Sequence, residues 1–264
     1  MTAGRGSGAR SNAASERRAE LLRLTRESGR LDAADAARLV GVSPETLRRD
    51  LRALEEAGLI RRSYGAAVPV ESGAYETGLA YRETNHAAEK ARIADAAARH
   101  LGEAQTIFLD EGYQTQLVAE RLPGDRPLTI LTSSLPVAAR LSERPNVQLL
   151  LLGGRVRGNT LGTVDHWAAD MLRQFVVDLA FVGANGVSET DGLTTPDPAV
   201  AMVKSAAVAT SKRRIFVGAS HKFGTSTFVR FAALTDFDVM ITGTELSASA
   251  AGRFAAAGAR LERV

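Results

Sequence analysis

Short apolar runs alternate with helical stretches through most of this 264-residue chain, and this alternation restricts the fold more than any other feature. The apolar runs have the buried character of strands and lie at residues 106–110, 128–133, 147–154, 178–186, 213–220 and 238–243. Helical patterns lie among them and before them, at residues 87–101, 115–122 and 134–143. Such alternation predicts an α/β domain in which helices cover a mostly parallel sheet. We expect this domain to occupy residues 87–264.

The ends of these predicted strands carry small and polar residues that suit a ligand pocket. In open α/β sheets, ligands bind beyond the carboxyl ends of the strands. Turns rich in glycine and hydroxyl groups offer backbone N–H groups to an anion, and Lys204 and Lys222 would add positive charge. The candidate effector-binding residues read from these ends are Asp110, Gly112, Ser133, Ser134, Gly153, Gly154 and Asn185. The alternative is ordinary turn chemistry with solvated lysines.

The first part of the chain has a different pattern, in which helices are followed by a basic hairpin. Helical signals open at Glu16 and again after Asp32. A third helix begins after Ser43, a good N-cap, with Pro44 at its first position. Leu59 and Ile60 then start a strand that the segment RRSYGA turns back as a wing. We predict a winged helix-turn-helix domain over residues 16–70, preceded by a disordered arm over 1–15 and followed by a linker over 71–86.

The third helix separates an apolar stripe from a basic face. Leu47, Leu51 and Leu54 recur at helical spacing, and the residues outside this stripe include arginines. A helix of this kind fits the major groove, where arginine binds guanine or a phosphate. The expected DNA-binding residues are Ser43, Thr46, Arg48, Arg49 and Arg52 on the helix, with Arg61, Arg62 and Tyr64 on the wing. The alternative is a three-helix bundle whose solvated arginines pair with Asp50, Glu55 and Glu56.

The basic charge is concentrated in the same region. Residues 1–64 hold 13 arginines against 9 acidic residues, which gives +4, whereas the whole chain has a net charge of +3. A small basic module beside a nearly neutral body suggests an anionic partner for the module. A solvated surface with a basic tail is the plainer explanation.

Several classes of protein and site are not expected. Cysteine is absent, which excludes a disulfide framework and thiolate metal sites. No apolar stretch approaches the length of a membrane helix, the start lacks a secretory signal, and we expect a cytoplasmic protein without a membrane partner. No dinucleotide fingerprint or P-loop is present, and the four histidines show no paired ligand spacing. We therefore expect no cofactor and no metal.

The N-terminal segments resemble the winged helix-turn-helix of the DeoR family of bacterial transcription regulators. The resemblance lies in residues 39–43, 46–51, 54–55 and 58–62. The family usually ends its wing with His-Gly-Gly, whereas this chain has Tyr64, Gly65 and Ala66.

The body resembles the effector domain of the same family, which shares a fold group with ribose-5-phosphate isomerase and CoA transferases. The matching positions are Asp110, Gly112, residues 132–135, 152–154, 181–186 and 191–192, Lys204 and residues 220–224. The resemblance implies a sugar phosphate or related metabolite as inducer and repression of a sugar-use operon.

Several positions in this body depart from the family pattern. Tyr113 and Gln114 replace two hydroxyl residues of the first loop, with Thr115 following as a candidate effector contact. Ser133 stands where Asn is common, and Ala219 replaces an aspartate. These departures leave open whether the effector is phosphorylated.

A sugar-phosphate isomerase is the alternative function. The related isomerases carry Asp-Gly-Ala-Asp-Glu at a strand end, where this chain has residues 182–186, Val-Gly-Ala-Asn-Gly. Isomerisation needs an acid and a base beside the sugar, and asparagine does not take a proton at neutral pH. A third possibility is a module that docks on protein. We predict a regulator without catalytic residues, a repressor acting on operator DNA as a homodimer or homotetramer.

Overall fold

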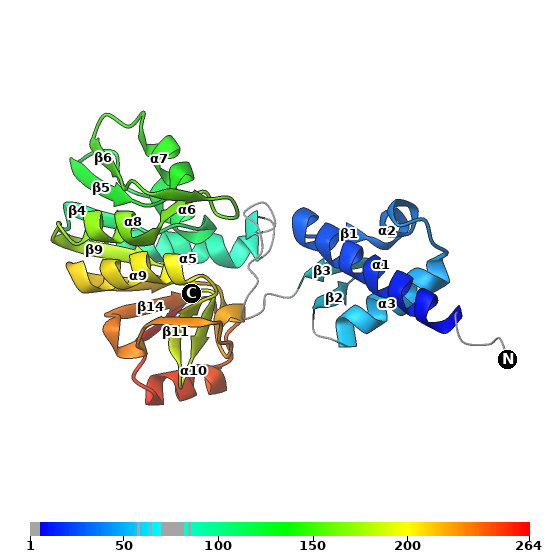
Figure 1. Ribbon diagram of the computed structural model, residues 1–264. Helices are drawn as coiled ribbons and strands as arrows, with labels where there is room; N and C mark the ends of the chain where they lie inside the picture. The colour runs from blue at the N-terminus through cyan, green and yellow to red at the C-terminus, as the bar shows by residue number, and fades with distance from the viewer. Residues whose placement is uncertain (1–5, 57–58, 64, 70–81, 84–85) are drawn as a thin grey trace. The chain divides into compact units, whose positions relative to one another are not determined.

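The computed structural model describes residues 6–56, 59–63, 65–69, 82–83 and 86–264 (Figure 1). The chain divides into two compact units, Met1–Arg82 and Glu83–Val264. Most of the expected linker, residues 71–86, lies outside the described residues. Within the described part of the chain, no helix combines the length and apolar character needed to cross a membrane.

The smaller unit is a winged helix-turn-helix, as predicted. Its helices are α1 (Gly6–Ser28), α2 (Ala33–Leu39) and α3 (Pro44–Glu56). Its strands are β1 (Leu31–Asp32), β2 (Ile60–Ser63) and β3 (Ala66–Pro69), which form an antiparallel sheet in the order β1-β3-β2. The buried core joins all three helices to the sheet through Leu21, Ala36, Leu47, Leu51, Leu54 and Ile60.

The first helix is longer than the sequence pattern predicted. It begins at Gly6, whereas the expected start was Glu16 and residues 1–15 were expected to be a disordered arm. That expectation is wrong for residues 6–15. Ala9, Ala13 and Ala14 are strong helix formers, and extending an existing helix is much easier than nucleating one.

The larger unit is built on a seven-stranded parallel sheet, which confirms the predicted α/β class. The strand order is β15-β14-β12-β9-β4-β5-β6, and every neighbouring pair is parallel. The strands are β4 (Thr106–Leu109), β5 (Leu128–Thr132), β6 (Val147–Leu151), β9 (Val177–Val182), β12 (Ser211–Val217), β14 (Val239–Thr242) and β15 (Leu261–Arg263).

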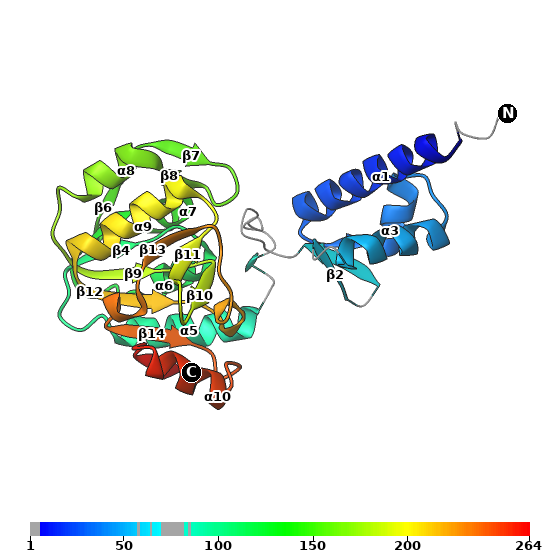
Figure 2. The same cartoon turned by 60° about the horizontal axis from the view of Figure 1, so that its bottom comes forward.

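Helices cover both faces of this sheet (Figures 1 and 2). On one face, α5 (Ala87–Arg99), α6 (Tyr113–Glu120) and α7 (Leu135–Leu141) pack on a core that includes Ile107, Leu109 and Phe181. On the other face, α8 (Asp165–Leu172), α9 (Pro198–Thr210) and α10 (Ala248–Ala256) pack on Phe108 and Val182. Alternate residues of one strand therefore enter opposite cores, which explains the unbroken apolar runs in the sequence.

Smaller antiparallel elements follow several strands and were not predicted. β10 (Gly186–Ser188), β11 (Gly192–Thr195) and β13 (Val229–Ala232) form one sheet, and β7 (Arg155–Arg157) pairs with β8 (Gly162–Val164). Two short 3-10 helices are η1 (Ser220–Lys222) and η2 (Leu234–Asp236). The run 178–186, expected as one strand, is split between β9 and β10.

Asp178 joins the amino ends of three neighbouring strands of the parallel sheet. Its carboxylate accepts hydrogen bonds from the Thr106 hydroxyl on β4 (2.7 Å) and the Lys212 ammonium on β12 (2.8 Å). The bond from Lys212, followed by those from Thr106, lowers the pKa of the Asp178 carboxyl below its ordinary value. The ionised carboxylate therefore stabilises the folded sheet.

Asp178→Asn is expected to lower the free energy of unfolding at neutral pH by about 1–2 kcal/mol, because charge-assisted hydrogen bonds become neutral ones. The lowered pKa means that this contribution is present above the ordinary Asp pKa of about 3.9 and is lost as pH falls below it. The variant should thus lose less stability than the parent between neutral pH and about pH 3. Urea unfolding at both pH values measures this, with Asp170→Asn, an exposed helical carboxylate, as the control. Equal pH dependence in parent and variant contradicts the assignment.

Candidate functional site

The turn before α3 sets the direction of that helix. The Ser43 hydroxyl accepts a hydrogen bond from the Thr46 backbone N–H (3.3 Å), so Ser43 acts as the predicted N-cap. The two hydroxyls lie 3.0 Å apart. Pro44 is the first residue of the helix, where its missing N–H has no cost. Ser43 and Thr46 are therefore fixed together at the start of α3.

The inner side of α3 is held by leucines and by a buried carboxylate. Leu47, Leu51 and Leu54 are buried, which confirms the apolar stripe. Asp50 is 2% exposed and accepts hydrogen bonds from Arg17 (2.6 Å) and Arg18 (3.0 Å) of α1. The alternative in which Asp50 pairs with the arginines of its own helix is therefore wrong.

The outer side of α3 presents its arginines to solvent. The side chains of Arg48 and Arg49 are 70% and 77% exposed, and Arg52 is also exposed. Arg48 and Arg49 form surface ion pairs with the exposed Glu45, at 2.8 and 3.5 Å. Exposed pairs of this kind contribute little free energy, so a phosphate or base edge can replace the carboxylate.

The wing carries the remaining predicted basic residues. Arg61 and Arg62 are exposed on β2, and Tyr64 lies outside the described residues. Arg62 is joined to α3, because its Nε donates to Glu55 Oε2 (2.6 Å) and its backbone N–H donates to Oε1 (3.0 Å). These bonds, with the backbone one the stronger influence, lower the pKa of the Glu55 carboxyl. Glu55 thus links the wing to the helix.

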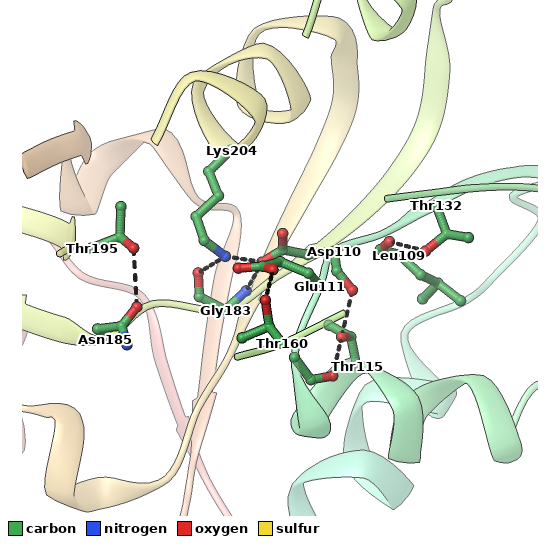
Figure 3. Close-up of polar contacts among 11 residues, drawn as sticks. Leu109, Asp110, Glu111, Thr115, Thr132, Thr160, Gly183, Asn185, Thr195 and Lys204 are labelled. Carbon is green, nitrogen blue, oxygen red and sulfur yellow. Dashed lines mark hydrogen bonds and ion pairs between the residues drawn. The ribbon is translucent and has the colours of Figure 1, made fainter. Parts of the chain in front are cut away.

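In the larger unit, polar side chains meet where β4 and β9 end (Figure 3). Asp110 follows β4 and is fully buried, and its Oδ2 accepts from the Gly183 backbone N–H after β9 (3.0 Å). Lys204 of α9 donates from Nζ to the same Oδ2 and to the Gly183 carbonyl (3.1 Å). The positive charge of Lys204 is therefore neutralised by Asp110 inside the fold.

The turn after Asp110 is held by its own residues. Gly112 has φ +111°, a conformation that side chains other than glycine rarely adopt, and it precedes α6. The Thr115 hydroxyl hydrogen-bonds to the carbonyls of Asp110 (2.6 Å) and Gly112 (2.9 Å). The expected contact residues Gly112 and Thr115 thus shape the loop around Asp110.

Asn185 follows β9, two residues after Gly183, and Figure 3 shows it joined to Thr195. Its side-chain oxygen accepts from the Thr195 hydroxyl (3.1 Å), and its backbone N–H donates to the Thr194 carbonyl (3.0 Å). The bonds orient a largely buried amide at the carboxyl edge of the sheet.

The two predicted serines after β5 differ in their surroundings. Ser134 caps α7, because its hydroxyl accepts from the Val137 N–H (3.3 Å). Ser133 is fully buried, and its carbonyl accepts from the Thr163 N–H (2.6 Å). Among the described residues, neither the Ser133 hydroxyl nor Asp110 Oδ1 has a hydrogen-bond partner. Buried polar atoms are nearly always paired, so these two atoms suit a ligand or water.

The other predicted residues lie on the loops that follow β6 and β12. Gly153 and Gly154 are exposed after β6, and an added Cβ at Gly154 would lie 2.7 Å from the Val164 carbonyl oxygen. They shape the entry to the β7–β8 hairpin. Lys222 lies in η1, beyond the end of β12, where its charge acts on His86.

Glu111 is a buried acid of this edge that the predicted set omitted. Its Oε2 accepts a hydrogen bond from the Thr160 hydroxyl, and an added Cβ at Gly162 would collide with it. Its position directly after Asp110, at the end of a predicted strand, could have identified Glu111 as a site residue from the sequence. Thr160 gave none, because only the β7–β8 hairpin brings it close.

Two family models match the sequence. Residues 17–72 match a DeoR-like helix-turn-helix domain, and residues 85–244 match a DeoR C terminal sensor domain.

Similarity to curated proteins extends over nearly the whole chain. The HTH-type transcriptional regulator GlpR of Haloferax volcanii is 35% identical, over 92% of this chain and 95% of that protein. The HTH-type transcriptional regulator GolR of Listeria innocua is 28% identical over 92% of this chain and 96% of its own length. The glycerol-3-phosphate regulon repressor of Escherichia coli is 28% identical, with 84% and 88% covered.

Among solved structures, ribose 5-phosphate isomerase A of Methanocaldococcus jannaschii aligns with a TM-score of 0.37 and 17% identity, over 51% of this chain and 53% of that one. A likeness of this size has no bearing on function.

Proposed function

Because the chain belongs to the DeoR family of transcriptional regulators, we propose that it represses a carbohydrate operon by binding operator DNA through residues 43–52 and the wing. A metabolite bound in the sensor domain releases it. The observation that carries the DNA-binding part is the arginine face of α3, which points to solvent. The buried Asp50 of this helix does not draw on that face, because Arg17 and Arg18 of α1 neutralise its charge.

The DNA contacts divide into two kinds. Ser43, Thr46, Arg48, Arg49 and Arg52 line the start and outer face of α3, and a helix in the major groove reads bases from its first turns. Arg61 and Arg62 lie on the wing, where phosphates are the expected contact. The exposure of these arginines supports the proposal.

The proposed effector is a hydroxyl-bearing metabolite, a phosphorylated sugar or a related compound. Asp110 Oδ1 and the Ser133 hydroxyl are buried polar atoms without partners among the described residues, and both suit effector hydroxyl groups. Since Lys204 is neutralised by Asp110, an effector phosphate would need backbone N–H groups at a helix start such as that of α6, which has no side-chain cap, with Lys222 as a further cation. The name of the E. coli relative supports a phosphorylated polyol as one candidate.

We also propose that the sensor domain binds without catalysis, that the protein acts as a homodimer or homotetramer, and that it works in the cytoplasm. Val182, Asn185 and Gly186 stand where the related isomerases have acids, and the Asp110 carboxylate is engaged by Lys204. An effector shifts DNA binding only through different affinities for the two states of the protein.

Gel retardation of the full-length protein on DNA from upstream of its own gene tests the proposal. We expect sequence-specific binding whose log–log salt slope is near −0.9 for each phosphate neutralised. Adding sugar phosphates and polyols one at a time should release the DNA with at least one of them. Binding to no fragment, or binding that is insensitive to salt, contradicts DNA recognition. Turnover of a pentose or hexose phosphate contradicts a purely sensing domain.

A further inference from the structure

Three ionisable side chains converge at the carboxyl edge of β12 and β14. They are His86 and Glu89, at the start of α5, and His221 in η1. One nitrogen or oxygen atom of each lies within 4.8 Å of the corresponding atoms of the other two. The imidazoles of His86 and His221 stack with ring centroids 4.4 Å apart and planes 14° apart.

Glu89 is the fixed member of the group. Its side chain is only 2% exposed, and its Oε1 accepts a hydrogen bond from the Ser220 backbone N–H (2.6 Å). Its other oxygen, Oε2, has no hydrogen-bond partner among the described residues and lies 3.5 Å from His86 Nδ1. A buried carboxylate oxygen left in this way is favourable only when a cation or a donor completes its surroundings.

The two histidines are the adjustable members. Both are exposed, and His86 precedes α5 with φ +55°. Each offers a ring nitrogen, which ligates a metal ion as the neutral imidazole.

We propose that His86, Glu89 and His221 bind one divalent transition-metal ion, with Zn²⁺ as the best chemical match. Two imidazole nitrogens and one carboxylate oxygen form a common zinc ligand set, with bonds of about 2.0–2.2 Å. Such bonds place ligand atoms about 3.4 Å apart in a tetrahedral site. The two exposed imidazoles must therefore rotate out of their parallel stack, so that one nitrogen of each points at the ion, and move inward by roughly 1 Å. The Ser220 N–H on Glu89 supplies the outer-shell bond that holds a ligating carboxylate in place.

This site goes beyond the proposed DNA and effector functions. A bound ion would join the first turn of α5 to the segment after β12, which also carries Lys222. Because the three side chains fill three of the four positions of a tetrahedral zinc site, the fourth position is left for water or an anionic group.

Calorimetric titration of the chelator-treated, full-length protein with ZnCl₂ tests the inference. We expect one Zn²⁺ per chain, little competition from Mg²⁺ or Ca²⁺, which prefer oxygen ligands, and a Zn²⁺-dependent rise in Tm. His86→Asn and His221→Gln should each weaken binding at least about 100-fold, since an outer-shell change already costs 10–100-fold. Asparagine tolerates the left-handed backbone at position 86.

Two further variants make the outcome decisive. Glu89→Gln keeps an acceptor for the Ser220 N–H but removes the charge, and it should also weaken Zn²⁺ binding. His166→Gln removes an exposed histidine of α8 that lies outside the cluster and should bind Zn²⁺ as the parent does. Absence of saturable Zn²⁺ binding in the parent overturns the proposal, as does unchanged affinity in His221→Gln with the fold verified by circular dichroism.

Discussion

Lys204→Met is expected to lower the free energy of unfolding of the larger domain by about 3–5 kcal/mol, the usual cost of removing one partner from a buried ion pair. Asp110 is fully buried, and Lys204 is the cation that neutralises it. After the substitution, the Gly183 N–H remains on Asp110 Oδ2, but no charge compensates the carboxylate. Urea unfolding followed by circular dichroism measures the loss.

Removing both charges should restore most of the lost stability. In Asp110→Asn/Lys204→Met, the amide oxygen at position 110 still accepts from Gly183, and the methionine side chain packs near Phe231. Replacing a buried pair by neutral groups is often close to neutral, so we expect the double variant to lie within about 2 kcal/mol of the parent. A double variant as unstable as Lys204→Met would show that packing, and not the charge pair, governs this site.

Arg49→Ala is the second large effect, and it acts on binding. If Arg49 reads a base pair, operator affinity falls by about 1–3 kcal/mol, or roughly 5–150-fold, and selectivity relaxes at that position. The fold should be unaffected, because the side chain is 77% exposed and its ion pair with Glu45 is 3.5 Å long. Gel retardation on the operator and on single-base variants measures both quantities.

The matched control is Arg23→Ala on α1. Arg23 also forms exposed pairs with acids three and four residues away, so the two variants lose the same charge and the same kind of pairing. We expect Arg23→Ala to bind the operator almost as the parent does. Equal affinity in Arg49→Ala and the parent removes Arg49 from the interface. A uniform loss with a salt slope smaller by about 1 reassigns it to a phosphate.

Local patterns predicted the elements well. The cap at Ser43, the leucine stripe of α3 and the buried parallel strands are properties of neighbouring residues, and the structure confirms them. Composition suggested a loose arm at residues 6–15, where glycine and serine outnumber alanine, but the structure includes these residues in α1 as an extension of the helix that follows.

Contacts between distant residues were beyond the sequence pattern. Lys204 was expected to offer positive charge to a ligand, but α9 brings it to Asp110, which is 94 positions away. His86 and His221 showed no ligand spacing, since their approach depends on α5 packing beside β12 and β14. Neither the Lys204–Asp110 pair nor the His86–His221 pair can be predicted until the order of the strands in the sheet is known.

The link between Glu55 and Arg62 bears on the entropy of association. Because the hairpin is attached to α3 through both a backbone and a side-chain bond, the two elements are already oriented toward each other before they meet the proposed operator DNA. Ordering loose segments is among the main costs of forming a complex. In this domain that ordering is completed when the chain folds, and more of the contact free energy remains available as affinity for DNA.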